Sequence, residues 1–235
     1  MTDIPVPGID FAKRAAAIKA ASLVQSGMKV GLGTGSTTAF AIEELGRRIR
    51  EEQLDIVGTP TSSSATLLAR QHGVPTRPLD ELGQLDIALD GADEVGPGLD
   101  LIKGRGAAQT REKIVAASAS RFIVLADDSK LVEVLGSKMP LPVEVVPMAA
   151  SYVRDRILEM GGSAEIRLGK MKDGPVVTDQ GFWVIDARFP APMNVGLVNT
   201  VLLTTPGVLD HGLFVGMASA AYIGQADGTV RILTA

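Results

Sequence analysis

Residues 85–113 read LDIALDGADEVGPGLDLIKGRGAAQTREK, and this stretch decides the fold. Its first residues, Leu85 to Leu89, form an apolar-rich run that is typical of a buried strand. Acidic residues follow at once, and Lys103, a Gly-Arg-Gly loop and a new helix come shortly afterwards. Ionisable groups of both signs around glycines at a strand end predict proton transfer on a small polar ligand, because ligands of open α/β sheets bind beyond the carboxyl ends of the strands. A solvated loop with surface ion pairs is the alternative interpretation of this stretch alone.

The same order of strand, glycine loop and helix occurs upstream. Met28 to Leu32 is a short apolar strand, Gly-Leu-Gly-Thr-Gly-Ser-Thr-Thr follows at 31–38, and a helix with one apolar face comes next. The backbone N–H groups and the dipole of such a helix start favour an anion, and nearby hydroxyl side chains would add donors. The spacing matches neither the dinucleotide fingerprint nor the nucleotide P-loop. The loop therefore predicts an anion site that is not a nucleotide site, with a plain tight turn as the alternative.

Alternating strand and helix signals predict right-handed crossovers and a parallel sheet. The further elements expected are a helix at 8–27 capped by Asp10, a strand at 55–60, a helix at 62–71, a helix at 108–119 and a strand at 122–126. Polar clusters follow three of the strands, at 33–38, 90–94 and 127–130. Because parallel strands end on the same side of a sheet, these clusters can converge.

The character of the sequence changes after Lys138. Residues 139–142 are interpreted as a linker, and the elements beyond follow a split β-α-β-β-α-β plan whose last strand is 213–216. The predicted fold class is α/β, a Rossmann-like parallel-sheet main domain with a smaller inserted α+β domain (ferredoxin-like, split β-α-β). The expected domains are residues 1–138 plus 211–235, the catalytic domain, and residues 139–210, the small domain.

Composition narrows the classes of function. The 235 residues are enough for a sizeable core, and 46% hydrophobic with 21% charged residues is ordinary for a soluble globular protein. A net charge of −4 gives no nucleic-acid footprint. The absence of cysteine excludes disulfides and zinc–thiolate sites and fits a reducing cytoplasm. With no secretory signal and no apolar run of membrane-spanning length, we expect a cytoplasmic protein with neither nucleic acid nor membrane as a partner.

Taken together, the motifs resemble the ribose-5-phosphate isomerase, type A, family. They are GxGTGST at 31–37, DGADE at 90–94, KGRGAA at 103–108, TREK at 110–113, ADDSK at 126–130 and PLPVEVVPMA at 140–149. The resemblance extends more weakly through GLFVG at 212–216 and the DGTVRI tail, so it covers nearly the whole chain. Many members of the family carry three glycines after the lysine of the third motif, whereas this chain has Arg105.

The resemblance implies an enzyme that interconverts D-ribose 5-phosphate and D-ribulose 5-phosphate in the pentose phosphate pathway, through an enediolate and without metal or cofactor. It implies Glu112 as the proton-transferring base, and Lys103 can stabilise the charge on the enediolate. Ring opening needs its own proton transfers, for which Asp90 and Asp93 are placed. The implied substrate-binding residues are Thr34, Gly35, Ser36 and Thr37, Asp90, Gly91, Ala92 and Asp93, Lys103, Gly104, Arg105 and Gly106, and Lys130. A phosphate contact from Lys13 and a homo-oligomer, dimer or tetramer, are further implications.

Two other classes of function remain open on the sequence. One is a non-catalytic sugar-phosphate-sensing domain of similar fold, which would need neither Glu112 nor Lys103. The other is an acyl-CoA transferase-like enzyme, whose covalent glutamate lies in a different glycine-rich context. Assay of ketose formation from ribose 5-phosphate separates all three.

Overall fold

The computed structural model describes residues 8–234, which form two compact units. Unit 1 contains the chain up to Ala92, the segment Arg111–Leu131 and the chain from Gly216 onward. Unit 2 contains Asp93–Thr110 and Val132–Val215. The sequence predicted limits at residues 139 and 210, and it did not include residues 93–110 in the smaller part.

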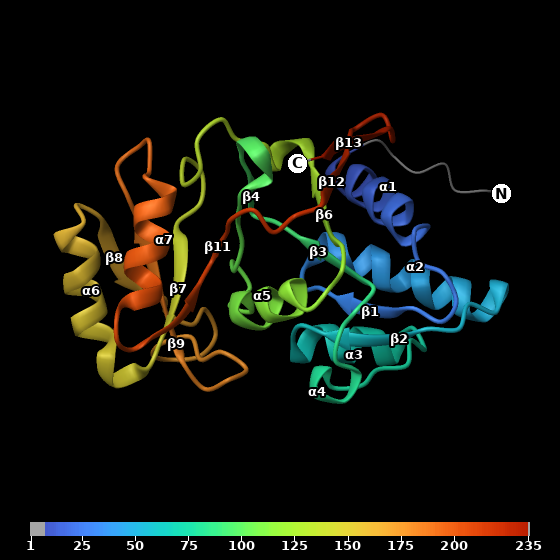
Figure 1. Ribbon diagram of the computed structural model, residues 1–235, viewed down its shortest axis with the longest axis horizontal. Helices are drawn as coiled ribbons and strands as arrows, with labels where there is room; N and C mark the ends of the chain where they lie inside the picture. Colours follow the sequence, from blue (N-terminus) through green and yellow to red (C-terminus); the bar gives the residue numbers. More distant parts are fainter. Residues whose placement is uncertain (1–7, 235) are drawn as a thin grey trace. The chain divides into compact units, whose positions relative to one another are not determined.

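Unit 1 is built on a six-stranded sheet in the order β13-β12-β6-β3-β1-β2 (Figure 1). Its strands are β1 (Lys29–Leu32), β2 (Val57–Pro60), β3 (Ile87–Gly91), β6 (Phe122–Asp127), β12 (Ala220–Gly224) and β13 (Val230–Thr234). Neighbouring strands run parallel, except that β12 and β13 form an antiparallel hairpin at one edge. The predicted parallel sheet is confirmed, and the C-terminal tail supplies its last two strands.

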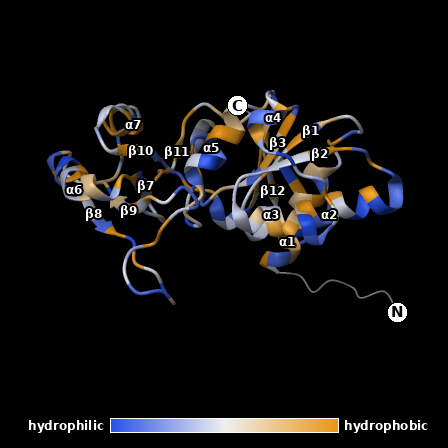
Figure 2. Cartoon of the chain, turned by 90° about the horizontal axis from the view of Figure 1, so that it is seen from below, coloured by the Kyte–Doolittle hydropathy of each residue, from blue (hydrophilic) through white to orange (hydrophobic). Residues whose placement is uncertain are grey.

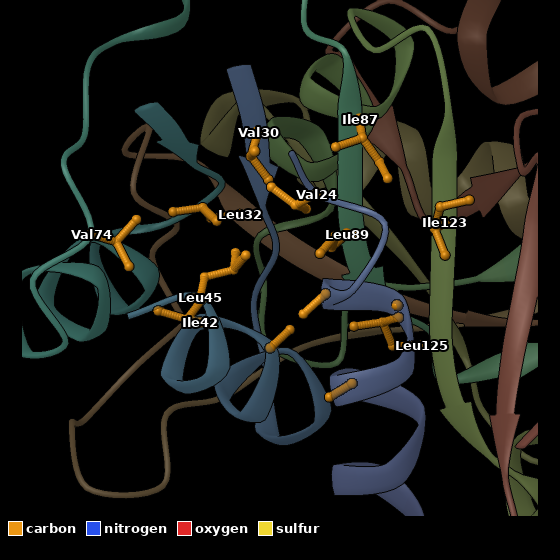
Figure 3. Close-up of a cluster of buried hydrophobic side chains, with 14 of the residues drawn as sticks. Val24, Val30, Leu32, Ile42, Leu45, Val74, Ile87, Leu89, Ile123 and Leu125 are labelled. Atoms are coloured by element: carbon orange, nitrogen blue, oxygen red, sulfur yellow. The ribbon is translucent and has the colours of Figure 1, made fainter. Parts of the chain in front are cut away.

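Helices cover both faces of this sheet. They are α1 (Ile9–Ala21), α2 (Ser36–Glu52), α3 (Ser63–Gln71), α4 (Leu79–Leu82) and α5 (Gln109–Ala117). Side chains at alternate strand positions, such as Val30 and Leu32, join the alanines of α1 and the apolar stripe of α2 in one buried cluster (Figure 3). On the opposite face, a Cβ atom at Gly31 would lie 2.6 Å from Val115, so the missing side chain lets α5 pack closely on β1.

Unit 2 contains a four-stranded antiparallel sheet in the order β10-β7-β9-β8. Its elements are β7 (Leu141–Val145), α6 (Ala150–Glu159), β8 (Ser163–Ile166), β9 (Trp183–Arg188), α7 (Val195–Thr204) and β10 (Val208–His211). The two helices bury an apolar stripe against the sheet, through Val153, Ile157, Val198 and Leu202. In the hydropathy colouring of Figure 2 these helices carry both apolar and polar residues. This is the predicted split β-α-β-β-α-β plan.

A three-stranded sheet completes unit 2 in the order β11-β5-β4. Its short strands are β4 (Glu94–Val95), β5 (Leu101–Ile102) and β11 (Leu213–Phe214). Unit 2 also contains the 3₁₀ turns η1 (Pro97–Leu99) and η3 (Pro147–Ala149), whereas η2 (Asp128–Lys130) follows β6 in unit 1. The small sheet matters for function because β5 ends directly before Lys103.

Some local predictions were wrong. The fourth strand of the inserted sheet is β10, whereas residues 213–214 pair with β5, because Gly212 separates two short apolar runs with different partners. The first helix ends at Ala21 and is preceded by Gly8, so Asp10 lies in its first turn and is not the N-cap. The expected linker at 139–142 is partly strand, since β7 begins at Leu141. No helix within residues 8–234 is long and apolar enough to cross a membrane.

Candidate active site

Three neighbouring parallel strands of unit 1 deliver polar residues to one edge of the sheet. β3 lies in the middle of the three, with β1 paired to one side of it and β6 to the other. β1 leads into the glycine loop, β3 ends in Asp90 and Gly91, and β6 leads into η2 with Lys130. The predicted convergence of the three strand ends is confirmed for the residues that belong to unit 1.

The glycine loop meets α2 in a way that suits an anion. Gly35 precedes the helix at φ 110°, a conformation that glycine adopts readily, and it offers no side-chain cap to the first turn. The N–H groups of that turn form the positive end of the helix dipole. Thr34, Gly35 and Ser36 line an open hollow of about 500 Å³ together with residues of α3. A hollow of this size beside a helix N-terminus can hold a phosphorylated sugar, although the hydroxyl-bearing Thr37 is itself buried.

Asp90 ties the end of β3 to this loop. Its Oδ1 accepts hydrogen bonds from the backbone N–H of Thr34 at 3.0 Å and from that of Gly91 at 2.7 Å, and the side chain is buried. Gly33 makes the approach possible, because a Cβ atom there would lie 2.1 Å from the same oxygen. Asp90 therefore has a structural role that the sequence did not predict, in addition to the catalytic role expected of it.

A group of hydroxyl side chains beside the loop was missed by the sequence analysis. The Thr34 hydroxyl lies 2.7 Å from that of Thr61 and donates to Ser62 at 2.7 Å. Ser62 in turn caps α3 by accepting from the Ala65 N–H at 3.0 Å. The sequence signal for these residues is the run Thr-Pro-Thr-Ser-Ser-Ser at 59–64, which begins in the last two residues of β2. Unlike the loop after β1, this run contains no glycine. These hydroxyls fix the Thr34 side chain and add polar surface to the same strand edge.

Glu112 lies in the first turn of α5 and is 5% exposed. It lines one small gap together with Asp90, Gly33 and Thr61. The two carboxylates expected to transfer protons therefore share one part of unit 1 with the glycine loop. Lys130, at the end of η2, is half-buried. Lys13 pairs with Asp10 at 3.4 Å on the first helix.

Lys103 is the buried cation of unit 2. Its side chain is 2% exposed, and its ammonium lies 5.3 Å from the centre of the Phe214 ring, within range of a cation–π contact. Its backbone N–H donates to the Gly212 carbonyl at 2.9 Å. The backbone and the side chain are therefore both held by the segment around β11.

The loop after Lys103 turns sharply and receives Asp93. Gly104 has φ +106°, which favours glycine. The Arg105 N–H donates to Asp93 Oδ2 at 2.8 Å, and the Arg105 Nε lies 3.7 Å from Asp93 Oδ1. The Arg105 side chain is otherwise exposed, as is Gly106. The backbone turn expected from the flanking glycines is therefore present with an arginine at its centre.

Glu94, the last residue of the DGADE motif, has a structural role, unlike the roles expected of Asp90 and Asp93. Its carboxylate is fully buried and accepts three backbone N–H groups, from Gly136, Lys138 and Met139, at 2.6 Å each. Such a carboxylate closes the loop before β7. We therefore assign Glu94 to the structure of unit 2, apart from the residues that can act on a ligand.

The predicted site residues fall into two groups. Unit 1 holds Thr34, Gly35, Ser36, Thr37, Asp90, Gly91, Ala92, Glu112 and Lys130, and unit 2 holds Asp93, Lys103, Gly104, Arg105 and Gly106. The first group combines an anion loop with two buried carboxylates, and the second combines a buried ammonium with a third carboxylate. Between residues 8 and 234, no three His, Asp or Glu side chains are grouped to hold a metal ion. These residue types can bind a phosphate and move protons on the molecule that carries it.

Comparison with known proteins places the chain among sugar-phosphate enzymes. Residues 57–228 match the model of the family described as ribose 5-phosphate isomerase A (phosphoriboisomerase A). A protein of Thermosynechococcus vestitus named ribose-5-phosphate isomerase A is 50% identical over 222 residues, which cover 94% of each chain.

Solved structures agree with this result. The ribose 5-phosphate isomerase A of Methanocaldococcus jannaschii superposes with a TM-score of 0.91 at 46% identity, covering 95% of this chain and 98% of that one. A D-ribose-5-phosphate isomerase in complex with phospho-erythronic acid gives a TM-score of 0.93 at 43% identity, covering 97% and 100%.

Proposed function

The chain belongs to the ribose 5-phosphate isomerase A family, and we propose that it interconverts D-ribose 5-phosphate and D-ribulose 5-phosphate with the two groups of residues described above. It is accordingly an aldose–ketose isomerase of the pentose phosphate pathway, which removes the sensor and the acyl-CoA transferase-like hypotheses. The observation that carries the assignment of residues is the arrangement in unit 1, where the glycine loop, Asp90 and Glu112 lie at one strand edge.

Phosphate binding is proposed for the loop of Thr34 to Thr37. The uncapped first turn of α2 supplies N–H donors and a favourable dipole, and the hollow beside it has room for the ligand. Binding the phosphate, which does not react, fixes the sugar and removes part of the entropic cost of reaching the transition state. The loop is held in place by the Thr34 N–H bond to Asp90.

Two carboxylates are proposed to transfer protons, and a third is proposed to orient the sugar. The substrate is mostly a closed ring, so Asp90 acts as the base in ring opening and Asp93 orients the sugar hydroxyls. Glu112 then takes the proton from C2 of the open aldose and returns it to C1, which one carboxylate can do because the two carbons are adjacent. The hydroxyl proton of O2 passes to O1 in the same conversion, and the negative charge of the enediolate develops on these two oxygens.

Lys103 is proposed to stabilise that charge. A buried ammonium acts strongly on a developing oxyanion because little water screens it. Phospho-erythronic acid, the ligand named for one related structure, carries a phosphate and a carboxylate. A planar carboxylate resembles the planar, negatively charged enediolate, which supports binding of that intermediate by the same kind of site.

Replacement of the proposed base tests the assignment. We expect Glu112→Gln to fold normally and to lose turnover of ribose 5-phosphate by roughly 10²-fold or more, since the amide cannot accept the proton. Glu165→Gln, at an exposed position of β8, is the matched control and should keep wild-type turnover. Intact turnover in Glu112→Gln would remove Glu112 as the base. Binding of ribose 5-phosphate by the wild-type protein without ketose formation would refute the isomerase assignment.

We also propose a homo-oligomer, dimer or tetramer, formed through unit 2, and a cytoplasmic location. Unit 2 exposes large apolar side chains, including Met148 at 93%, Leu197 at 54% and Leu203 at 55%. Light scattering should give a mass of two or four chains, and Leu203→Glu should lower it. The lack of cysteine fits a reducing compartment, and fractionation of the source cells tests the location.

A further inference from the structure

Arg167 lies directly after β8 and contacts the loop that follows Lys103. Its Nη1 donates to the Gly104 carbonyl at 2.9 Å and to the Arg105 carbonyl at 3.1 Å. Its Nε and Nη2 pair with Asp186 of β9 at 2.9 and 2.5 Å. The side chains of the pair are 16% and 26% exposed, so water screens this contact less than a surface ion pair.

The backbone that carries Arg167 is itself held on both sides. The Arg167 N–H donates to the Val184 carbonyl, and the Arg167 carbonyl accepts from the Val176 N–H, both at 2.8 Å. The guanidinium is planar, and Asp186 engages it in the two-pronged geometry that fixes its plane. Both the backbone of Arg167 and the plane of its guanidinium are therefore fixed where the side chain contacts the loop.

The geometry of the peptide bond transmits this contact to Asp93. The bond between Gly104 and Arg105 is trans, so its carbonyl and its N–H point in opposite directions. Arg167 and the Ala107 N–H, at 2.9 Å, hold the carbonyl on one side. The N–H on the other side donates to Asp93 Oδ2 at 2.8 Å. A rotation of this peptide would remove the donor that orients the carboxylate.

We propose that Arg167, fixed by Asp186, is a positioning residue that sets the orientation of the Asp93 carboxylate through the Gly104–Arg105 peptide. The inference rests on the proposed function, in which Asp93 orients the sugar during ring opening. The path runs from β9 to Arg167, from Arg167 to one peptide plane, and from that plane to Asp93. Arg167 itself is not proposed to touch the substrate.

Arg48 offers a matched control within the same chain. Its side chain is 17% exposed, its Nε pairs with Glu52 at 3.0 Å, and its Nη1 donates to the carbonyls of Ala21 and Val24 at 2.7 and 3.0 Å. Arg48 thus matches Arg167 in burial, in having a carboxylate partner and in donating to two backbone carbonyls, although only its Nε engages the carboxylate. It lies near the C-terminal end of α2, away from the proposed site residues. Lysine at either position keeps the positive charge but removes the planar guanidinium and its set of fixed N–H donors.

The experiment compares Arg167→Lys with Arg48→Lys in melting temperature and in steady-state kinetics with ribose 5-phosphate. We expect similar losses of Tm, a fall in kcat of about tenfold or more for Arg167→Lys only, and little change in KM, since a misplaced catalytic group costs transition-state stabilisation. Asp186→Asn, which keeps the shape of the partner but removes its charge, should lower kcat in the same direction. It also keeps the test available if Arg167→Lys does not fold.

A double variant tests the route through Asp93. In an Asp93→Asn background, Arg167→Lys should lower kcat by less than about twofold, because residues that act as a unit are not additive. Wild-type kcat in Arg167→Lys, or a full additive loss in the double variant, would overturn the inference. Wild-type kcat in Asp93→Asn alone would instead refute the role given to Asp93 in the proposed function, so the two failures are distinguishable.

Discussion

Gly33→Ala is the sharpest test of how the anion loop is built. A Cβ atom at residue 33 would lie 2.1 Å from Asp90 Oδ1, 2.2 Å from its Cγ and 2.6 Å from its Cα. Non-bonded carbon contacts are favourable only near 3.5–4.0 Å, so the two segments must separate by roughly 1 Å. Gly33 does not have a left-handed backbone, so the cost comes from the close approach and not from φ.

The separation breaks two hydrogen bonds that hold the loop. They are the Gly33 N–H to the Leu89 carbonyl at 2.9 Å and the Thr34 N–H to Asp90 at 3.0 Å. Overpacking costs about 1–3 kcal/mol, and a lost hydrogen bond to a charged acceptor costs about 1.5–3 kcal/mol. We therefore expect a loss of about 3–5 kcal/mol in the free energy of unfolding, with a fall in Tm of roughly 10 °C. The KM for ribose 5-phosphate should rise, because the loop is the proposed phosphate site.

Thermal unfolding and steady-state kinetics measure both effects, and Gly196→Ala is the matched control. Gly196 lies inside α7, and the nearest atom to an added Cβ is Asn194 Oδ1 at 3.9 Å. Alanine there should stabilise the helix by about 0.5–1 kcal/mol. The reasoning is refuted if Gly33→Ala has the same Tm as the wild-type protein and the same KM for ribose 5-phosphate.

Other predictions follow from buried and paired polar groups. Glu94→Gln should lower the free energy of unfolding by about 2–4 kcal/mol, measured from the midpoint of urea unfolding. The reason is that the NH₂ group of the amide cannot accept a hydrogen bond, so one of the three N–H groups at 136, 138 and 139 loses its acceptor. An unchanged midpoint would contradict this. Gln109→Leu should raise stability by about 1–3 kcal/mol, since within residues 8–234 neither amide atom of this fully buried side chain has a hydrogen-bond partner; a lower midpoint would show that the amide is satisfied. The Thr229 hydroxyl and N–H lower the pKa of Asp227 below its usual 3.8. The folded-state pKa lies below the unfolded one, so the contribution of Asp227 is present above pH 3.8 and disappears as the pH falls through the folded pKa; a carboxyl NMR titration in which Asp227 titrates normally would contradict it.

The main sheet could be predicted because its signals are local. Runs such as 85–89 and 122–126 are rich in apolar residues, as is typical of strands buried on both faces, and Asp86 is the one polar residue in them. The inserted sheet could be predicted in plan but not in its last strand. β10 and β11 are two short runs with similar composition, and only their partners, β7 and β5, distinguish them. Strands of two residues, such as β4, carry no periodicity to detect.

Some residues of the candidate site could likewise be predicted from local sequence signals, and others could not. The glycine loop and Asp90 could be found because glycine and carboxylate at a strand end are unusual in a buried setting. Thr61 and Ser62 look like ordinary helix-start residues until the fold brings them to the Thr34 hydroxyl. Arg167 could not be found at all, because its acceptors lie 62 and 63 residues away along the chain and its ionic partner 19.

The DGADE motif shows why a dense set of charges in a sequence overstates the number of catalytic groups. Its three carboxylates lie within five residues, yet Asp90 accepts from the glycine loop, Asp93 from Arg105, and Glu94 from three amides before β7. The lone pairs of Glu94 are engaged by backbone donors, which leaves it unsuited to accept a proton from a substrate. Asp93 accepts one backbone N–H, from Arg105, so this donor can set the orientation of the carboxylate and still leave lone pairs for the sugar hydroxyls that Asp93 is proposed to orient. The number of backbone donors on each carboxylate therefore distinguishes Glu94, which fixes the loop before β7, from Asp93, which the Arg105 N–H orients for its proposed role. This number depends on the fold and cannot be obtained from the sequence.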